Sequence, residues 1–71
     1  MLVYPNPASG KLNLQFSEEV KQIRIIDLQG REAMIVTNDF KQINIESLTN
    51  GIYFIEITTF LGKVTKKFVK E

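Results

Sequence analysis

Polar and apolar side chains alternate along most of this chain, with the period of two residues that a β-strand requires. The alternation is clearest over residues 11–16, 42–45 and 53–57, and it places Phe54 on the outer, exposed face of its strand. No segment repeats apolar residues at helical spacing over several turns. The sequence therefore predicts an all-β fold, with antiparallel sheets that bury one face.

Residues 23–28 and 33–36 are apolar at both alternating sets of positions. A strand carries apolar side chains on both faces when both faces are covered, or when a β-bulge shifts the alternation. Both segments are therefore expected to be central strands that are partly covered on both sides, or strands with a bulge.

Two four-residue turns predict hairpins. Asp27 to Gly30 and Thr59 to Gly62 each place a side-chain oxygen first and a glycine fourth. This spacing suits a type I turn followed by a glycine of positive φ in a bulge, because glycine adopts positive φ without steric cost. Further breaks fall at residues 7–10, 17–19, 37–39 and 50–51.

These turns divide the chain into about seven short strands, at the spacing of an immunoglobulin-like antiparallel β-sandwich. Leu48, Gly51 and Tyr53 have the spacing of a tyrosine corner, in which the tyrosine hydroxyl bonds to a backbone group upstream. With Gly30 and Gly62, these residues are assigned a structural role. A chain of 71 residues holds a single domain, which we place over residues 1–71.

The residue types that most enzymes and metal sites use are missing. The chain has no histidine and no cysteine, and so lacks the commonest general base, thiol nucleophile and zinc ligands. Glu18 and Glu19 are adjacent carboxylates that point apart, and they are interpreted as a solvated turn. Asp27 and Asp39 occupy positions that turns favour, so calcium is only an alternative. The sequence predicts no catalytic residue, no cofactor and no metal.

The formal net charge of +1 gives no overall field toward nucleic acid or an anionic membrane. No apolar run approaches the roughly 20 residues of a membrane-spanning helix, and no signal-peptide pattern opens the chain. Membrane insertion is therefore not expected.

Charge is nevertheless concentrated near residue 71, where Lys63, Lys66, Lys67 and Lys70 supply four of the nine basic residues. Lysines on an edge strand commonly prevent edge-to-edge aggregation. They can also serve specific recognition or, with Phe68 and the exposed Phe54, form a platform for single-stranded nucleic acid. The first two interpretations stay open, and nucleic acid is not the predicted partner.

Four segments together resemble one family over essentially the whole chain. They are Val3-Tyr4-Pro5-Asn6-Pro7-Ala8, residues 23–31, Leu48-Thr49-Asn50-Gly51-Ile52-Tyr53, and residues 62–70. In this order they resemble the type IX secretion system C-terminal sorting domain. The ordered combination is far more specific than any one motif, because a Gly-x-Tyr element occurs in many sandwiches.

The resemblance implies a sandwich appended to larger passenger proteins of the Bacteroidota, recognised in the periplasm and passed through an outer-membrane translocon to the cell surface or beyond. It also implies later removal by a cell-surface sortase, at a point before the sandwich. Residues 1–71 are then a sorting domain taken from the C-terminal part of a longer secreted protein, and the expected partners are the translocon, the sortase and the passenger.

Recognition by the translocon is expected on the final strand and on the proline motif. The residues concerned are Lys63, Lys66, Lys67, Phe68, Val69, Lys70, Pro5, Asn6 and Pro7. Lys66, Lys67 and Lys70 are expected on a solvent-facing edge, where strand addition is a plausible docking mode. Pairing of two copies through edge strands is left open.

The alternative function is an immunoglobulin-like structural or adhesive module that spaces domains or binds glycans. Stacking on a sugar needs exposed aromatic side chains, and the sequence offers only Phe54 and Phe60, with no tryptophan.

Overall fold

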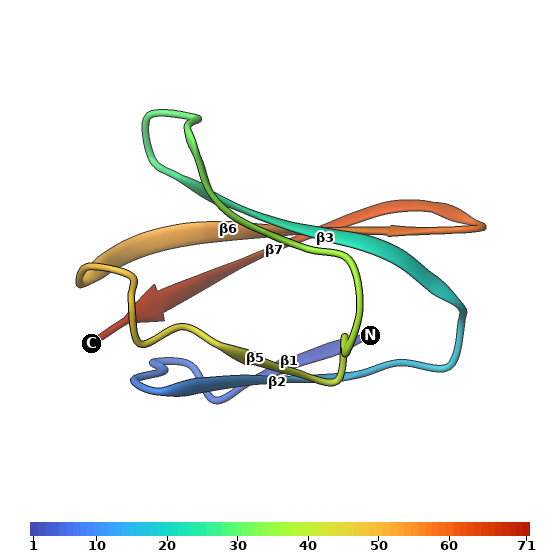
Figure 1. Cartoon of the computed structure of the whole chain (residues 1–71), viewed down its shortest axis with the longest axis horizontal. Coiled ribbons are helices and arrows are strands. Elements are labelled where there is room, and N and C mark those ends of the chain that lie inside the picture. The colour runs from blue at the N-terminus through green and yellow to red at the C-terminus, as the bar shows by residue number, and fades with distance from the viewer.

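The computed structural model describes residues 1–71 as seven strands in two antiparallel sheets that pack face to face (Figure 1). The strands are β1 (Leu2–Tyr4), β2 (Lys11–Gln15), β3 (Val20–Asp27), β4 (Glu32–Val36), β5 (Gln42–Asn44), β6 (Gly51–Thr59) and β7 (Gly62–Lys70). This all-β sandwich confirms the predicted fold class. The structure has no helix of the length and apolar character that a membrane span needs.

The strand order is β1-β2-β5 in the smaller sheet and β4-β3-β6-β7 in the larger one. β3 is central, as its doubly apolar pattern predicted, and its pairing with β4 shifts register between Ile25 and Ile26. β4 has a similar pattern but lies at an edge, where Ile35 is 49% exposed. The central-strand alternative for residues 33–36 is therefore wrong. The bulge alternative is confirmed, because the register shift leaves Ala33 without a partner on β3.

The core is one cluster of buried side chains between the sheets. Its members are Ala8, Leu12, Leu14, Val20, Ile23, Ile25, Ile43, Ile45, Leu48, Tyr53, Ile55, Ile57 and Phe68. Alternate residues of β2 and β6 supply much of it, because successive strand residues point to opposite faces. Phe54 lies on the outer face opposite Ile26 and is half-buried, so its expected exposure is wrong.

Both predicted hairpins form. At the β3–β4 turn, Gly30 has a φ of 83° and its N–H donates to the Asp27 carbonyl at 3.0 Å. At the β6–β7 turn, pairing continues to Thr59 and Gly62 without a register shift. The second hairpin therefore has a two-residue loop, Phe60-Leu61, and no bulge.

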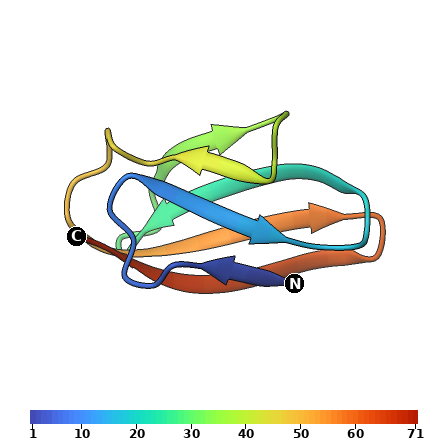
Figure 2. The same ribbon diagram turned by 90° about the horizontal axis from the view of Figure 1, so that it is seen from below.

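The proline motif takes the chain from the smaller sheet to the edge of the larger sheet, and the chain then returns to the smaller sheet in β2. β1 pairs with β2, and four residues after β1 ends, Ala8 forms a parallel bridge with Lys70 of β7. Figure 2 shows β1 and β7 along the same side of the sandwich, with the β1–β2 loop reaching the last part of β7. The peptide bonds before Pro5 and Pro7 are both cis.

Candidate functional site

The last strand, β7, lies at an edge of the larger sheet and pairs only with β6. Residues directly opposite each other in an antiparallel pair point to the same face. Phe68 lies opposite the buried Tyr53, and Lys66 lies opposite the buried Ile55. Even-numbered residues of β7 therefore point toward the smaller sheet, and odd-numbered residues point outward.

The second half of β7 is built into the core. Phe68 is fully buried, and its ring stacks on Tyr53 with a centroid separation of 5.6 Å. Lys70 is only 7% exposed, which overturns the expectation that it lies on a solvent-facing edge. The reason is its position: it has the inward alternation of Phe68, and the chain at Ala8 covers it.

Asn6 caps the edge of β7 with its side chain. Its Oδ1 accepts from the Val69 N–H at 2.9 Å, and its Nδ2 donates to the Lys67 carbonyl at 3.4 Å. A side-chain amide offers one acceptor and donors in the plane of a peptide-like group. Asn6 therefore takes the place of one residue of a neighbouring strand.

Ala8 continues the same edge through its backbone. Its N–H donates to the Val69 carbonyl at 2.8 Å, and its carbonyl accepts from the Glu71 N–H at 2.8 Å. Ala8 is 1% exposed, so this contact is also packed. We call Asn6, Pro7 and Ala8, bound to residues 67–71, the edge clamp.

The edge clamp joins the two motifs that the sequence singled out, although about sixty residues separate them. A comparison of the sequence with known protein families identifies the family of the chain. The family model described as "Secretion system C-terminal sorting domain" matches residues 2–71. The chain belongs to this family. Its members are the C-terminal signals for type IX secretion, and this sorting domain is therefore a secretion signal.

A curated relative carries a matching segment. Residues of this sorting domain are 35% identical to Beta-agarase D of Zobellia galactanivorans over 65 residues, which is 92% of this chain and 13% of that protein. The sorting domain thus corresponds to a small part of the relative's length.

The expected recognition residues fall into two groups. Phe68 and Lys70 are buried and Val69 is half-buried, so these three belong to the packed half of the strand. Lys63, Lys66 and Lys67 are exposed, as are Pro5, Asn6 and Pro7 beside the clamp. The structure brings the proline motif next to Lys67, since the Asn6 side chain forms hydrogen bonds with the Lys67 carbonyl and the Val69 N–H.

Lys63 ends a row of alternating charges on the outer face of the larger sheet. Its Nζ lies 3.7 Å from Glu56 Oε1, which lies 3.5 Å from Arg24 Nε, and Arg24 Nε is 3.8 Å from Glu32 Oε1. The row crosses all four strands, one residue on each. Lys66, Lys67 and Lys70 form no ion pair in the structure, and of these three Lys66 and Lys67 are exposed.

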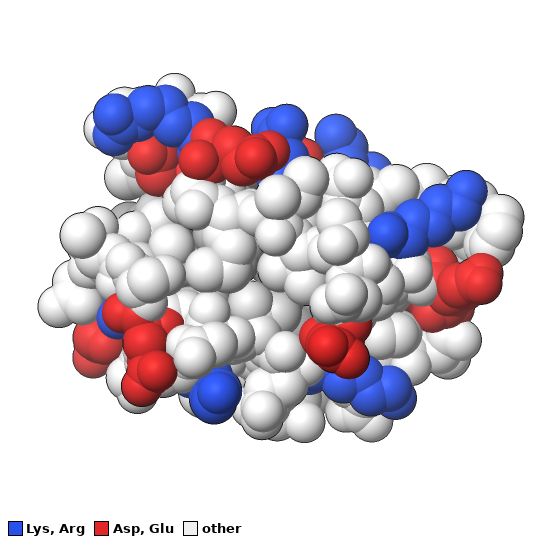
Figure 3. Space-filling model, viewed as in Figure 1, with Lys and Arg blue, Asp and Glu red and all other residues white.

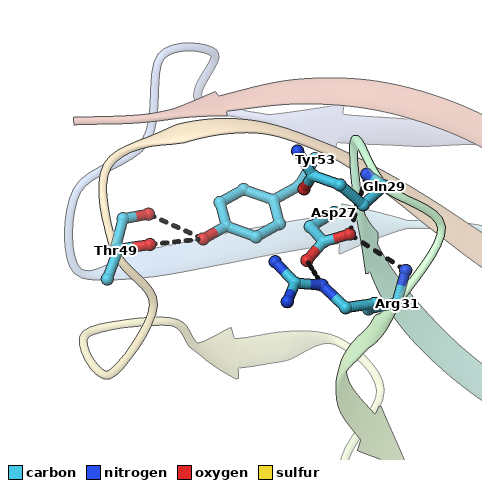
Figure 4. A network of polar contacts seen from close by, with 5 residues as sticks. All are labelled: Asp27, Gln29, Arg31, Thr49 and Tyr53. Carbon is cyan, nitrogen blue, oxygen red and sulfur yellow. Dashed lines mark hydrogen bonds and ion pairs between the residues drawn. The ribbon is translucent and has the colours of Figure 1, made fainter.

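The tyrosine corner lies at the opposite end of β6 from the hairpin loop (Figure 4). The Tyr53 hydroxyl donates to the Thr49 carbonyl at 2.7 Å and lies 3.1 Å from the Thr49 hydroxyl. Gly51 has a φ of 153°, in the region that favours glycine. These contacts hold the segment before β6, including the buried Leu48, against the core.

Asp27 organises the neighbouring turn in the same view. Its carboxylate accepts from the backbone N–H of Arg31 and of Gln29, each at 2.9 Å, and from Arg31 Nε at 3.0 Å. The Arg31 backbone donor, above all, lowers the pKa of Asp27 below its usual value. Asp27 therefore has a structural role: its carboxylate stabilises the turn.

Nothing in the structure gathers three or more acidic, histidine or cysteine residues as a metal site would require. Glu18 accepts from the Ser17 hydroxyl at 3.4 Å, beside the exposed Glu19. Of the aromatics considered for sugar stacking, Phe60 is 68% exposed in the hairpin loop and lies 4.1 Å from the Lys21 ammonium.

Sequence reasoning missed the partner of Asn6 and the role of Ala8. An asparagine between two prolines indicates a fixed, extended amide, but the position of its partner depends on how the two sheets pack. Alternation alone did not indicate the burial of Lys70, because Lys66 shares the inward alternation of Val64 and Phe68 and is exposed.

Proposed function

We propose that this sorting domain directs a passenger protein, attached before residue 1, from the periplasm through the type IX translocon to the cell surface or the medium. We further propose that the translocon recognises the exposed part of β7 together with the neighbouring proline motif. A sortase at the cell surface then removes the domain by cutting before the sandwich.

The edge clamp is the observation that supports this recognition site. Asn6 binds Lys67 and Val69 directly, so the proline motif and the final strand present one continuous surface. A receptor that contacts this surface can distinguish the folded domain from an unrelated chain that carries only one of the motifs.

Export of a reporter tests the function. The fusion joins a signal peptide, a reporter and residues 1–71, and it is expressed in a Bacteroidota strain with or without a working translocon. We expect the reporter at the cell surface or in the medium only when the translocon works. The control fusion ends at the reporter and should stay in the periplasm. Equal export in both strains would overturn the proposal.

Removal by a sortase has its own measurement in the same strains. The exported reporter should be smaller than the periplasmic precursor by at least the mass of residues 1–71. A strain without the sortase should accumulate the uncut form. An exported fusion that keeps the whole domain in both strains would contradict removal.

A further inference from the structure

The edge clamp covers only part of the free edge of β7. Its contacts use the Lys67 carbonyl, the N–H and carbonyl of Val69, and the N–H of Glu71. Backbone groups in an antiparallel strand alternate between its two sides. The N–H and carbonyl groups of Lys63 and Thr65, and the N–H of Lys67, therefore face the same edge. No strand lies beyond β7 to pair with them.

We call residues 63–67 the open edge. Four of its five side chains are exposed, and the fifth, Val64, is half-buried. The segment contains three lysines and no acidic residue, and only Lys63 has an ion-pair partner. The side of the sandwich that the β4–β5 connection crosses differs, because basic and acidic groups are interspersed there (Figure 3).

The open edge is thus a strand template with a local positive charge. Unpaired backbone groups on an edge pair readily with an added extended segment, which gains affinity from main-chain hydrogen bonds. Charges beside the edge then select among segments, because opposite charges across a strand pair stabilise it and like charges oppose it.

We propose that the open edge binds an extended, acidic segment of a partner protein by strand addition. This inference rests on the proposed function and names the chemistry of the translocon component that reads the domain. The added strand is short, because Asn6 occupies the edge from the Lys67 carbonyl onward.

A second copy of the chain fits the open edge less well than an acidic segment does. Antiparallel pairing of two copies centred on Thr65 would set Lys63 of each copy opposite Lys67 of the other. Such a pair brings positive charges together with no acidic residue in either segment.

The decisive variants change one backbone donor and keep the strand. Thr65→Pro removes an N–H that faces the open edge and bonds to no residue of β6, and proline is accepted at such edge positions. Thr65→Val keeps that N–H and is the matched control. In the reporter fusion, we expect Thr65→Pro to lower export about tenfold and Thr65→Val to leave it unchanged.

Thermal melting of the isolated 71-residue variants separates binding from folding. If Thr65→Pro melts well below Thr65→Val, Lys63→Pro is compared with Lys63→Ala instead, because the Lys63 N–H faces the same way. The charge variant, Lys66→Glu with Lys67→Glu, should also reduce export.

Each outcome decides the inference. Equal export of folded proline and control variants overturns strand addition, whatever the charge variant does. Loss of export in the charge variant alone indicates contact through lysine side chains, as with an anionic lipid surface, and also overturns it. A dimer of the isolated domain that Thr65→Pro dissolves without affecting export makes a second copy the occupant. Failure of the parental fusion to export would instead overturn the proposed function.

Discussion

The two halves of β7 differ in almost every property although they form one strand. Residues 68–70 are packed, carry the fully buried Phe68 and are tied to residues 6–8. Residues 63–67 are mostly exposed and positively charged, and no strand pairs with their free edge. The comparison separates the half of the strand that packs into the core from the half for which recognition is proposed, so variants can test the two halves independently.

This division changes how the lysines must be tested. A triple change of Lys66, Lys67 and Lys70 to glutamate combines two exposed positions with a buried one. The sequence alone had placed all three lysines on a solvent-facing edge. The burial of Lys70 makes the double change at Lys66 and Lys67 the appropriate variant.

The largest effect is expected from Phe68→Ala in the packed half. Truncating a buried phenylalanine costs about 3–5 kcal/mol of unfolding free energy, and this one also stacks on Tyr53. Phe60→Ala is the matched control, because Phe60 is 68% exposed. Melting followed by circular dichroism measures both. Equal melting temperatures would show that β7 is not packed as described.

Lys70→Glu should have the next largest effect. Lys70 is 7% exposed, and an unpaired carboxylate at a buried position is among the costly changes, here about 2 kcal/mol. Lys67→Glu, on the same strand but exposed, should change stability by less than about half a kcal/mol. Denaturant unfolding of the two variants gives the difference. A Lys70 variant as stable as the Lys67 variant would contradict the burial of Lys70.

Asn6→Ala should extend the open edge into the packed half. It removes two side-chain hydrogen bonds to β7 and is expected to cost about 1 kcal/mol. The more specific measurement is amide hydrogen exchange: the Val69 N–H should exchange faster in the variant, while the Thr65 N–H already exchanges fast in the parent. Asn6→Asp retains the acceptor for Val69 and should keep that amide protected. Unchanged exchange at Val69 in Asn6→Ala would show that the cap does not form.

The smallest stability effect belongs to the double variant Lys66→Glu with Lys67→Glu. Neither lysine has an ion-pair partner to lose, so each change should contribute within about half a kcal/mol. Circular dichroism melting should therefore match the parent, even though export is expected to fall. A large loss of stability would remove the distinction between the two halves of β7.

The sequence predicted the sandwich because the alternation in β2, β5 and β6 is regular and each strand buries one face. It did not distinguish β3 from β4, since both are apolar at alternating and intervening positions. Only the strand order, which depends on long-range pairing, makes one central and the other an edge.

The candidate site was predictable only in part. The lysines near residue 71 and the proline motif could be identified from the sequence, but their contact could not. Asn6 meets Lys67 and Val69 because the loop between β1 and β2 reaches the edge of the larger sheet at Ala8, and local patterns carry no information on that contact.

The edge clamp also has a consequence for the timing of synthesis. Asn6 bonds to residues 61 and 63 positions further along the chain, and Ala8 bonds to Glu71. A ribosome that stops early, anywhere in the passenger or in the first six strands, therefore releases a polypeptide that cannot close the clamp. If the translocon reads the closed edge, unfinished proteins are left behind without any separate proofreading factor.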